Sequence, residues 1–315
     1  MDPRPLQFVV GKGGVGKSTI TAAIAIAYVR AGRRVLAIEL GRREGLSRLL
    51  APSIATGAEP VEVRPGLWLA RVQGDDALAE YLEMVVPIRR LLNIVFASRM
   101  YRYFVAAAPG LKELMAIGKI WFERQKKRED GRPLWDTIVV DAGASGQSLQ
   151  YLQMPAAAAR TFRKGLVHRE SERVAALLSD AETTAVHVVA IPEDMPLTEA
   201  REVLARLANE LKLPVGTVYL NRTRAGAPEG ATIAVDALSR VSSDSPNGAL
   251  ATAVHATATR SLAWIRLQED KLDRFERGVS RRCVRLPLLT AEEFGLAEIE
   301  QLADALGPSP VTRTP

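Results

Sequence analysis

The chain has 315 residues, of which 47% are apolar and 25% charged, and it carries a formal net charge of +6. This composition is that of a globular protein with a substantial core. A single cysteine, Cys283, excludes an internal disulfide and a CxxC metal or redox site. No apolar run reaches the ~18 residues of a membrane-spanning helix, and the N-terminus lacks the charged and apolar regions of a signal peptide. We therefore expect a cytoplasmic protein that meets membranes only indirectly.

The basic charge balance fits three kinds of partner: nucleic acid, an anionic membrane surface, or a polyphosphate. The chain has no basic helix with interleaved aromatic residues, and aromatic residues make up only 5% of it. Nucleic acid is therefore disfavoured as a partner.

Apolar runs alternate with helical segments along the chain. Leu6–Val10 is an apolar run typical of a buried strand, a helix is predicted over Ser18–Ala31, and Val35–Ile38 is a second buried strand. A strand, a helix and a strand in so short a span form a βαβ unit, which requires a parallel sheet. Further strands are predicted at 137–140, 187–191, 215–220 and 284–286, and helices at 197–211, 249–277 and 291–306. The fold class that follows is α/β, with a doubly wound, mostly parallel sheet.

Two stretches depart from this alternation. Residues 75–130 form a long apolar helical insertion, which either packs on the core or a dimer interface, or provides an apolar groove for a protein client. Residues 222–246 are rich in Gly, Ala, Ser and Pro and are predicted to be a loop. We expect one domain over residues 1–315, with a loose tail at 307–315.

The segment after the first strand matches the pattern G-x-x-x-x-G-K-S/T. Glycines let backbone N–H groups converge on an anion, and the following helix directs its positive dipole end at the same point. Lys17 would reach the β and γ phosphates of ATP, and the Ser18 hydroxyl would ligate Mg²⁺. A lysine at a helix N-terminus opposes the dipole by ~0.3–1 kcal/mol unless an anion is present, which disfavours an ordinary turn. The residues of this phosphate loop are Gly11, Lys12, Gly13, Gly14, Val15, Gly16, Lys17, Ser18 and Thr19.

Lys12, directly after the first glycine, makes the loop resemble the deviant Walker motif. That motif marks the P-loop ATPases that include the nitrogenase iron protein, the partition and division-site ATPases, the arsenite-pump ATPase and the tail-anchored-protein-targeting ATPase. In that family the extra lysine reaches across a dimer interface to the partner's nucleotide. The resemblance therefore implies a homodimer, or a heterodimer with a related ATPase.

Four further segments resemble the arsenite-pump and tail-anchored-targeting branch. Asp141, with Ser145-Gly146 after it, resembles the second switch and implies Mg²⁺ binding through water; an N-cap role is the alternative. Glu193 matches a glutamate near the nucleotide, or is only a charge at a helix N-terminus. Asn221 matches an asparagine that pairs with adenine, or is a simple turn residue. Pro287 begins a P-L-L segment that packs against the base in the family.

The chain also departs from the pattern of this branch. Gly41 stands where the family has the aspartate that orients the attacking water, so Glu39 is the carboxylate that would replace it, with Glu44 also nearby. The candidate catalytic residues are therefore Lys12, Lys17, Asp141 and Glu39. The interfacial CxxC pair of the targeting ATPase is absent, so a dimer must be held otherwise.

The resemblance implies a dimeric ATPase switch that couples nucleotide state to a protein partner, with slow or partner-dependent hydrolysis. Two alternatives remain. In the first, the chain is a catalytically weak regulatory subunit of a heterodimer, which Gly41 favours. In the second, it is a surface ATPase of the partition or division-site type, which the lack of an amphipathic C-terminal helix disfavours.

Overall fold

The computed structural model describes residues 1–41, 44–77, 110–143, 145–241 and 246–306. Within them, strands form one eight-stranded sheet in the order β3-β4-β2-β5-β1-β6-β7-β8. Neighbouring strands are parallel except β3 and β4, which are antiparallel. The strands are β1 (Leu6–Gly11), β2 (Val35–Leu40), β3 (Val61–Arg64), β4 (Leu67–Val72), β5 (Thr137–Asp141), β6 (Thr184–Ala190), β7 (Val215–Thr223) and β8 (Cys283–Pro287). This confirms the predicted doubly wound, mostly parallel fold.

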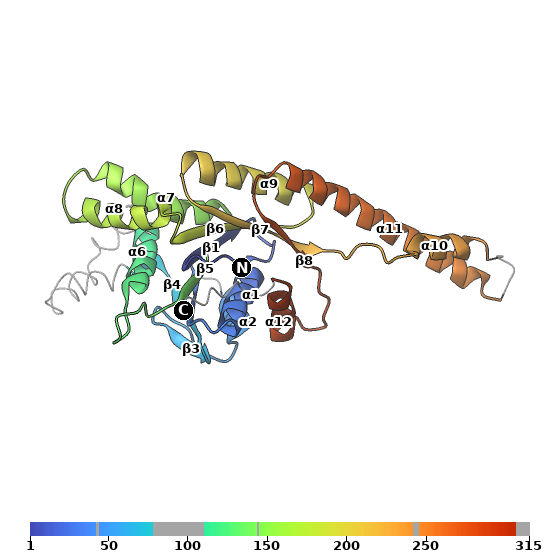
Figure 1. Ribbon diagram of the computed structural model, residues 1–315, viewed down its shortest axis with the longest axis horizontal. Helices are drawn as coiled ribbons and strands as arrows, with labels where there is room; N and C mark the ends of the chain where they lie inside the picture. Colours follow the sequence, from blue (N-terminus) through green and yellow to red (C-terminus); the bar gives the residue numbers. More distant parts are fainter. Residues whose placement is uncertain (42–43, 78–109, 144, 242–245, 307–315) are drawn as a thin grey trace, which may run out of the picture.

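Helices cover both faces of the sheet (Figure 1). One face carries α1 (Lys17–Arg30), α2 (Gly45–Leu50) and α12 (Leu296–Ala305). The other face carries α6 (Leu111–Gln125), α7 (Ser145–Thr161), α8 (Leu166–Ser179), α9 (Asp194–Ala205) with its π-helical continuation (Arg206–Glu210), and the end of α11 (Gly248–Arg277). The sheet is therefore the middle layer of three.

The strand residues divide between two hydrophobic cores. Phe8 and Val10 pack into the core beneath α6 to α9, whereas Val9 between them packs into the core beneath α1 and α12. This follows from the alternation of side chains along a strand. Because both faces are buried, the central strands read in the sequence as nearly continuous apolar runs, and for this reason they were predictable.

The antiparallel pair β3–β4 was not predicted from the sequence. β3 has only four residues, none of them buried, and it lies at the edge of the sheet. A short edge strand that faces solvent needs no apolar pattern, so the signal used for the central strands is missing. The helices α7 and α8 were also not predicted from the sequence. α7 contains Pro155 in its interior, and a proline inside a helical pattern argues against a helix.

The prediction of a loop over 222–246 was wrong in part, since only 224–230 lack helix and strand before α10 begins. β7 continues to Thr223, and α10 spans Ala231–Ser239. No residue of α10 is buried. The Gly, Ala, Ser and Pro residues around this short helix are turn signals, and they conceal it in the sequence.

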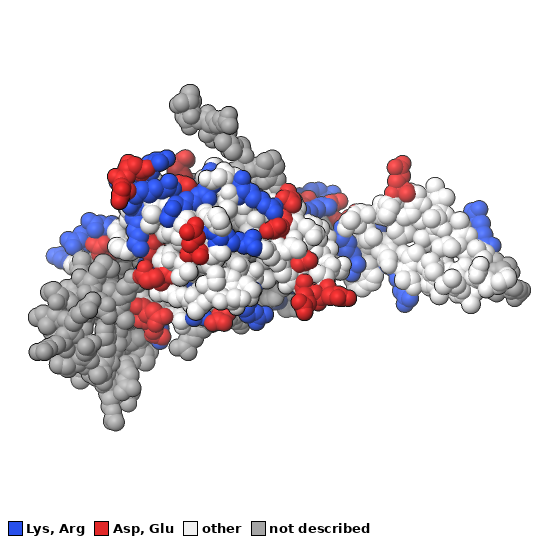
Figure 2. Space-filling view, turned by 90° about the horizontal axis from the view of Figure 1, so that it is seen from below, with Lys and Arg blue, Asp and Glu red and all other residues white. Residues whose placement is uncertain are grey.

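α10 packs along the first part of α11, and together they form an arm that extends away from the body (Figure 1). Ile233 and Leu250 on this arm are 75% and 65% exposed. From 231 to 241 and from 246 to 263, the Lys, Arg, Asp and Glu residues are only Asp236, Arg240 and Arg260, and Figure 2 shows the arm as a mainly uncharged surface. The described arm therefore offers no basic face for nucleic acid or an anionic membrane.

A buried polar network lies in the α1-facing layer of the sheet. His187 of β6 is fully buried; the Thr217 backbone N–H donates to its Nδ1 at 2.9 Å, and its Nε2 lies 3.1 Å from Gln7 Oε1. The Gln7 amide in turn donates to the Tyr28 hydroxyl at 2.5 Å. Because Nδ1 accepts a hydrogen bond, the imidazole is neutral with its proton on Nε2. Burial lowers the pKa of His187 to about 4.

Most of the predicted insertion (residues 75–130) and the predicted tail (307–315) lie outside the described residues. The described end of the insertion contains α6, whose Ala116, Ile117 and Ile120 are buried against the core. No helix among the described residues combines the length and the apolar character needed to cross a bilayer.

Candidate nucleotide site

The phosphate loop leaves the carboxyl end of β1, between β5 on one side and β6 on the other. The chain runs from β1 to β2 in one direction and reaches β6 in the other, so β1 marks the point where the winding reverses. In open α/β sheets, ligands bind in the crevice at such a switch point. The fold therefore places the loop where a ligand site is expected.

Gly16 fixes the geometry of the loop where α1 begins. Its φ of 93° lies in the left-handed region, and a Cβ added here would lie 2.4 Å from Asn221 Nδ2. Asn221, at the end of β7, donates from the same Nδ2 to the Val15 carbonyl at 2.9 Å. A glycine is therefore required so that the end of β7 can hold the loop closely.

The residues of the loop fit a polyphosphate. A Cβ at Gly13 or Gly14 would meet no heavy atom within 4 Å, and both residues are exposed, so this turn borders open space. Lys17, only 8% exposed, donates from Nζ to the Lys12 carbonyl at 2.8 Å across the loop. An ammonium group held at a helix N-terminus opposes the helix dipole, and a bound anion relieves that opposition.

The predicted metal ligands Ser18 and Asp141 lie in contact. The Ser18 hydroxyl donates to Asp141 Oδ2 at 2.5 Å, and Asp141 ends β5 next to β1. Burial raises the pKa of Asp141, although the hydrogen bond from Ser18 and the charge of Lys17 oppose this effect. One hydroxyl and one carboxylate suit Mg²⁺, which takes few protein ligands and keeps water and phosphate oxygens for the rest. Consistently, the described residues contain no group of three or more His, Cys, Asp or Glu side chains that could enclose a metal.

Asp141→Asn tests this assignment. We expect the Mg²⁺ concentration needed for half-maximal ATP binding to rise roughly 10–100-fold, because the charge that favours the cation is lost. Without ligand, unfolding by urea should show equal or greater stability, because the variant no longer buries a carboxylate. Unchanged Mg²⁺ dependence in a folded variant would remove Asp141 from the metal site.

Glu39 lies beside this pair but already has partners. It is paired in register with Asp141 across β2 and β5, and it is 2% exposed. Its two carboxylate oxygens accept hydrogen bonds from the Leu46 backbone N–H at 2.8 Å and the Ser47 hydroxyl at 3.0 Å. Burial raises the pKa of Glu39. The carboxylate thus holds the start of α2 against the site, which is a positioning role. The catalytic role expected from the sequence stays a prediction.

Gly41, at the position of the family's aspartate, has a φ of 95°, and its N–H donates to the Val72 carbonyl at 2.9 Å. A left-handed backbone favours glycine over residues with a side chain. The local conformation of the chain after β2 therefore suits a glycine at this position.

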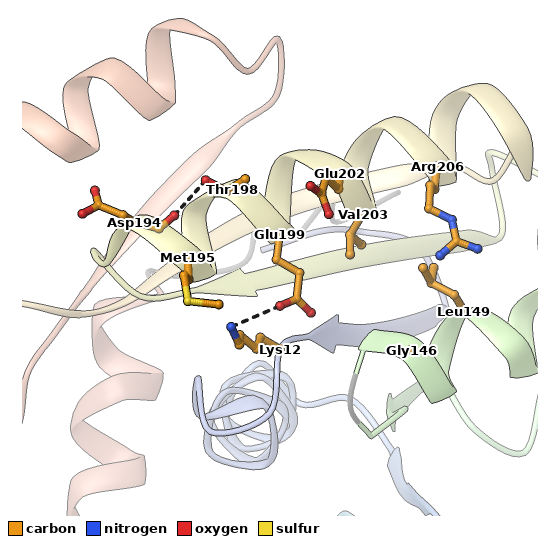
Figure 3. Close-up of a pocket in the computed structure, with 10 residues that line it drawn as sticks. All are labelled: Lys12, Gly146, Leu149, Asp194, Met195, Thr198, Glu199, Glu202, Val203 and Arg206. Atoms are coloured by element: carbon orange, nitrogen blue, oxygen red, sulfur yellow. Dashed lines mark hydrogen bonds and ion pairs between the residues drawn. The ribbon is translucent and has the colours of Figure 1, made fainter.

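Lys12 points away from the phosphate loop and toward α9. Its Nζ lies 3.5 Å from Glu199 Oε2, and Figure 3 shows Glu199 reaching from α9 to meet it, with Met195 beside the pair. The two side chains are 32% and 30% exposed. They border a cavity of about 500 Å³ between α9 and the start of α7, where Gly146 lies.

The remaining predicted residues surround the β7 side of the loop. Asn221 makes the contact with Val15 described above, and its Oδ1 accepts from the Arg222 N–H at 2.9 Å. Glu193 is exposed just before α9. Pro287 ends β8, where it is paired in register with Thr223. These residues, the phosphate loop and Asp141 all lie at the carboxyl edge of the sheet.

Sequence reasoning missed two contacts at this site. The pairing of Lys12 with Glu199 joins residues from two separate elements, and no local pattern indicates it. The hydrogen bonds from Leu46 and Ser47 to Glu39 were also missed. A buried acidic residue in an otherwise apolar strand was the available signal, because a buried carboxylate needs partners.

The loop, its place at the switch point and the contact of Ser18 with a carboxylate at the end of β5 define a P-loop nucleotide-binding protein. Residues 6–170 match the anion-transporting ATPase family. This chain belongs to that family, which confirms the resemblance drawn from the sequence.

Individual relatives agree with this assignment. ATPase BagA of Mycobacterium tuberculosis is 33% identical over 262 residues, which cover 79% of this chain and 74% of the relative. ATPase GET3 of Podospora anserina is 25% identical over 52% of this chain and 47% of its own length. The arsenical pump-driving ATPase of Acidiphilium multivorum is 27% identical over 49% of this chain and 26% of its own length. All three relatives are named as ATPases.

Proposed function

We propose that this chain binds ATP with Mg²⁺ on the phosphate loop and hydrolyses it as a dimeric switch that couples nucleotide state to a protein partner. The observation that carries the proposal is the 2.5 Å contact between Ser18 and Asp141. It joins the phosphate loop to the segment that leads into α7, so a ligand at Ser18 acts directly on that segment. Such a link between a phosphate site and a neighbouring segment is how nucleotide switches work.

Each residue has a role in the proposed reaction. Lys17 binds the β and γ phosphates and stabilises charge on the transferring group. Ser18 and Asp141 hold Mg²⁺, the latter through water; when bound, the cation neutralises phosphate charge. Asn221 retains one N–H and one lone pair beyond its two hydrogen bonds, which suits the edge of a base.

The dimer is the part of the proposal that depends on Lys12. In the described conformation Lys12 pairs with Glu199 of its own chain. A pair this exposed contributes only ~0–1 kcal/mol, so it opens at little cost when a partner's nucleotide competes for the lysine. We therefore propose that Lys12 pairs with Glu199 in the open state, and that it contacts the partner's nucleotide in the closed dimer.

Light scattering with and without MgATP tests this dimer. We expect mass to double with MgATP, and we expect Lys12→Ala to reduce the dimer fraction and to lower turnover at least tenfold. Lys164→Ala, an exposed lysine between α7 and α8, is the matched control and should behave as the wild type. A strict monomer in every nucleotide state would contradict the dimer.

A second candidate function is a nucleotide-binding regulatory subunit with negligible turnover. Two observations favour it. Gly41 has no side chain that could orient water, and both carboxylate oxygens of Glu39 already accept hydrogen bonds, from Leu46 and Ser47. Tight ATP binding with no phosphate release by the chain alone, and release after a related ATPase is added, would select this candidate over the first.

The protein client is proposed to contact residues 75–130. The described end of this range contains α6, which uses its buried residues to pack on the core. Hydrogen–deuterium exchange of residues 75–130 with and without MgATP checks the coupling. Identical protection in both states would contradict a switch that acts through this segment.

A further inference from the structure

The arm formed by α10 and α11 carries much of the exposed apolar surface of the described chain. Large apolar side chains are exposed at thirteen described positions, and six of these lie between residues 231 and 267. The six are Ile233, Val241, Leu250, Val254, Trp264 and Leu267. Apolar residues scattered singly over a surface need no explanation, whereas a concentration of them marks an interaction site.

One stripe of exposed residues runs along α11, and we call it the outer seam. It consists of Leu250, Val254, Thr257, Ser261 and Trp264, all of them exposed. Their spacing alternates between four and three residues, which is the 3.5-residue repeat with which helices pair in coiled coils. The outer seam therefore has the pattern of a helix that packs against another helix.

α10 does not cover the outer seam. Ala251 is buried, and His255, Ala258 and Leu262 are partly buried, so these residues mark the face of α11 on which α10 packs. Each of them lies one position after a seam residue, which is ~100° around a helix. The outer seam thus lies beside the covered face and stays open.

The arm projects past the carboxyl edge of the sheet, where the phosphate loop lies (Figure 1). Lys271 of α11 pairs with Asp194, just after β6, at 2.9 Å, and Gln268 accepts from the Arg224 N–H, just after β7, at 2.6 Å. Because Phe275, further along α11, is buried in the body, the residues before Gln268 extend beyond this edge. A subunit that faces the phosphate loop would therefore meet the arm.

The outer seam is complementary to a copy of itself in the antiparallel direction. With a two-fold axis at Thr257, this residue meets its own copy, Val254 lies opposite Ser261, and Leu250 lies opposite Trp264. The small residues of the centre let the two helices approach, and the large residues close both ends. Such a self-complementary surface is what a two-fold interface requires.

The charges of the arm do not oppose this pairing. Within the described residues of 246–263, Arg260 is the only Lys, Arg, Asp or Glu. It flanks the outer seam, and in the antiparallel register it lies opposite Ala253. Like charges therefore do not meet across the seam.

We infer that the outer seam is a docking surface for the outer seam of a second copy of this chain, and that the two arms pair antiparallel in the closed dimer. The inference rests on the proposed function and deepens it. A two-fold axis at Thr257 turns the two carboxyl edges toward each other, as a contact of Lys12 with the partner's nucleotide requires. A parallel pair would leave both edges pointing the same way.

The size of the seam links this pairing to nucleotide. From Leu250 to Trp264 it measures ~21 Å, and a helix with its side chains is ~10 Å wide. A stable interface buries about 800 Å² on each partner, far more than this strip provides. The arms therefore pair in the dimer that MgATP closes, and not on their own.

Cysteine cross-linking with MgATP tests the register. Thr257→Cys should form a disulfide between two copies, because residues at the axis come within the ~7 Å between Cα atoms that a disulfide spans. Val254→Cys and Ser261→Cys should each fail to cross-link alone and should cross-link when the two variants are mixed. The wild type, whose own thiol is Cys283, is the control and should stay uncross-linked.

A charge on the seam tests its contribution to affinity. We expect Val254→Glu to weaken the MgATP dimer at least about tenfold in light scattering over a range of concentrations, because the dimer would bury two unpaired carboxylates. ATP binding by the monomer should not change, since Val254 is 43% exposed and lies on the arm. Thr259→Glu places the same charge on the opposite, exposed side of α11 and should dimerise as the wild type does.

The inference is overturned if Val254→Glu dimerises with MgATP as the wild type does, which would leave the seam to a helix of another protein. It is also overturned if Val254→Cys and Ser261→Cys each cross-link alone, which would make the arms parallel. In both cases the proposed function stands, because MgATP still doubles the mass. A wild-type chain that stays monomeric with MgATP would instead remove the proposed dimer, and this inference with it.

Discussion

Replacing Lys17 with alanine is expected to lower the rate of ATP hydrolysis by roughly 10²–10³-fold, the usual cost of removing one group that stabilises transition-state charge. The ammonium group lies within the loop, 2.8 Å from the Lys12 carbonyl and largely shielded from water. A charge in such a place acts through a lower effective dielectric than a surface lysine does. Phosphate release at saturating MgATP measures the effect.

Two variants make this result specific. Lys17→Arg keeps the charge but replaces a compact ammonium by a planar fork, and it should recover little activity because the loop closes around a point charge. Lys164→Ala changes an exposed lysine and should keep full activity. The melting temperature of Lys17→Ala should change little without ligand, because the ammonium group opposes the dipole of α1 but also donates to the Lys12 carbonyl and favours the Asp141 carboxylate.

Each outcome selects between the two candidate functions. Wild-type turnover in a folded Lys17→Ala chain would move hydrolysis away from the phosphate loop. If the wild-type chain itself shows no turnover, the ATP affinities of the wild type and Lys17→Ala are compared instead. A large loss of ATP affinity in Lys17→Ala would then identify the loop as the nucleotide site of a regulatory subunit.

The sequence was sufficient to predict the centre of the site because two local rules govern it. The loop motif follows a strand and starts a helix, so the place of Lys17 and Ser18 is determined within a dozen or so residues. Asp141 follows another buried strand, and the carboxyl ends of parallel strands meet at one edge of the sheet. These rules need no knowledge of the tertiary structure.

The rest of the site depends on contacts between distant segments. Asn221 reaches Val15 across 206 positions of sequence, and Glu199 of α9 meets Lys12 through a side-chain contact that no local pattern indicates. Such pairings follow from the assembled layers, which a single sequence does not show.

Glu39 shows how the structure changes the interpretation of a residue. From the sequence, a carboxylate near the missing aspartate is a candidate base. In the structure both of its oxygens hold the start of α2, and Gly45, at that start, lies so close that an added Cβ would be 2.8 Å from the Ser18 hydroxyl. Glu39 therefore sets the distance between α2 and the metal ligands, whichever group positions the water.

Acidification is expected to destabilise the folded chain through His187. Burial lowers the pKa of this imidazole to about 4, whereas an exposed histidine titrates near ~6.5. Between these values the unfolded chain binds a proton that the folded chain does not, so the contribution to stability is fully present above about pH 6.5 and is lost as the pH falls toward 4. The difference corresponds to about 3 kcal/mol in total, of which about 2 kcal/mol is lost by pH ~5.

Urea unfolding of the wild type and of His187→Gln at about pH 7.5 and pH 5 measures this contribution. Glutamine supplies both an acceptor for the Thr217 N–H and a donor for Gln7 Oε1, yet it does not titrate. The free energy of unfolding should therefore fall by about 2 kcal/mol less in His187→Gln than in the wild type, since the buried carboxylates contribute equally to both. His255→Gln, on the arm, should retain the wild-type pH dependence. If His187→Gln and the wild type lose the same free energy on acidification, the buried histidine is not the group that couples stability to pH.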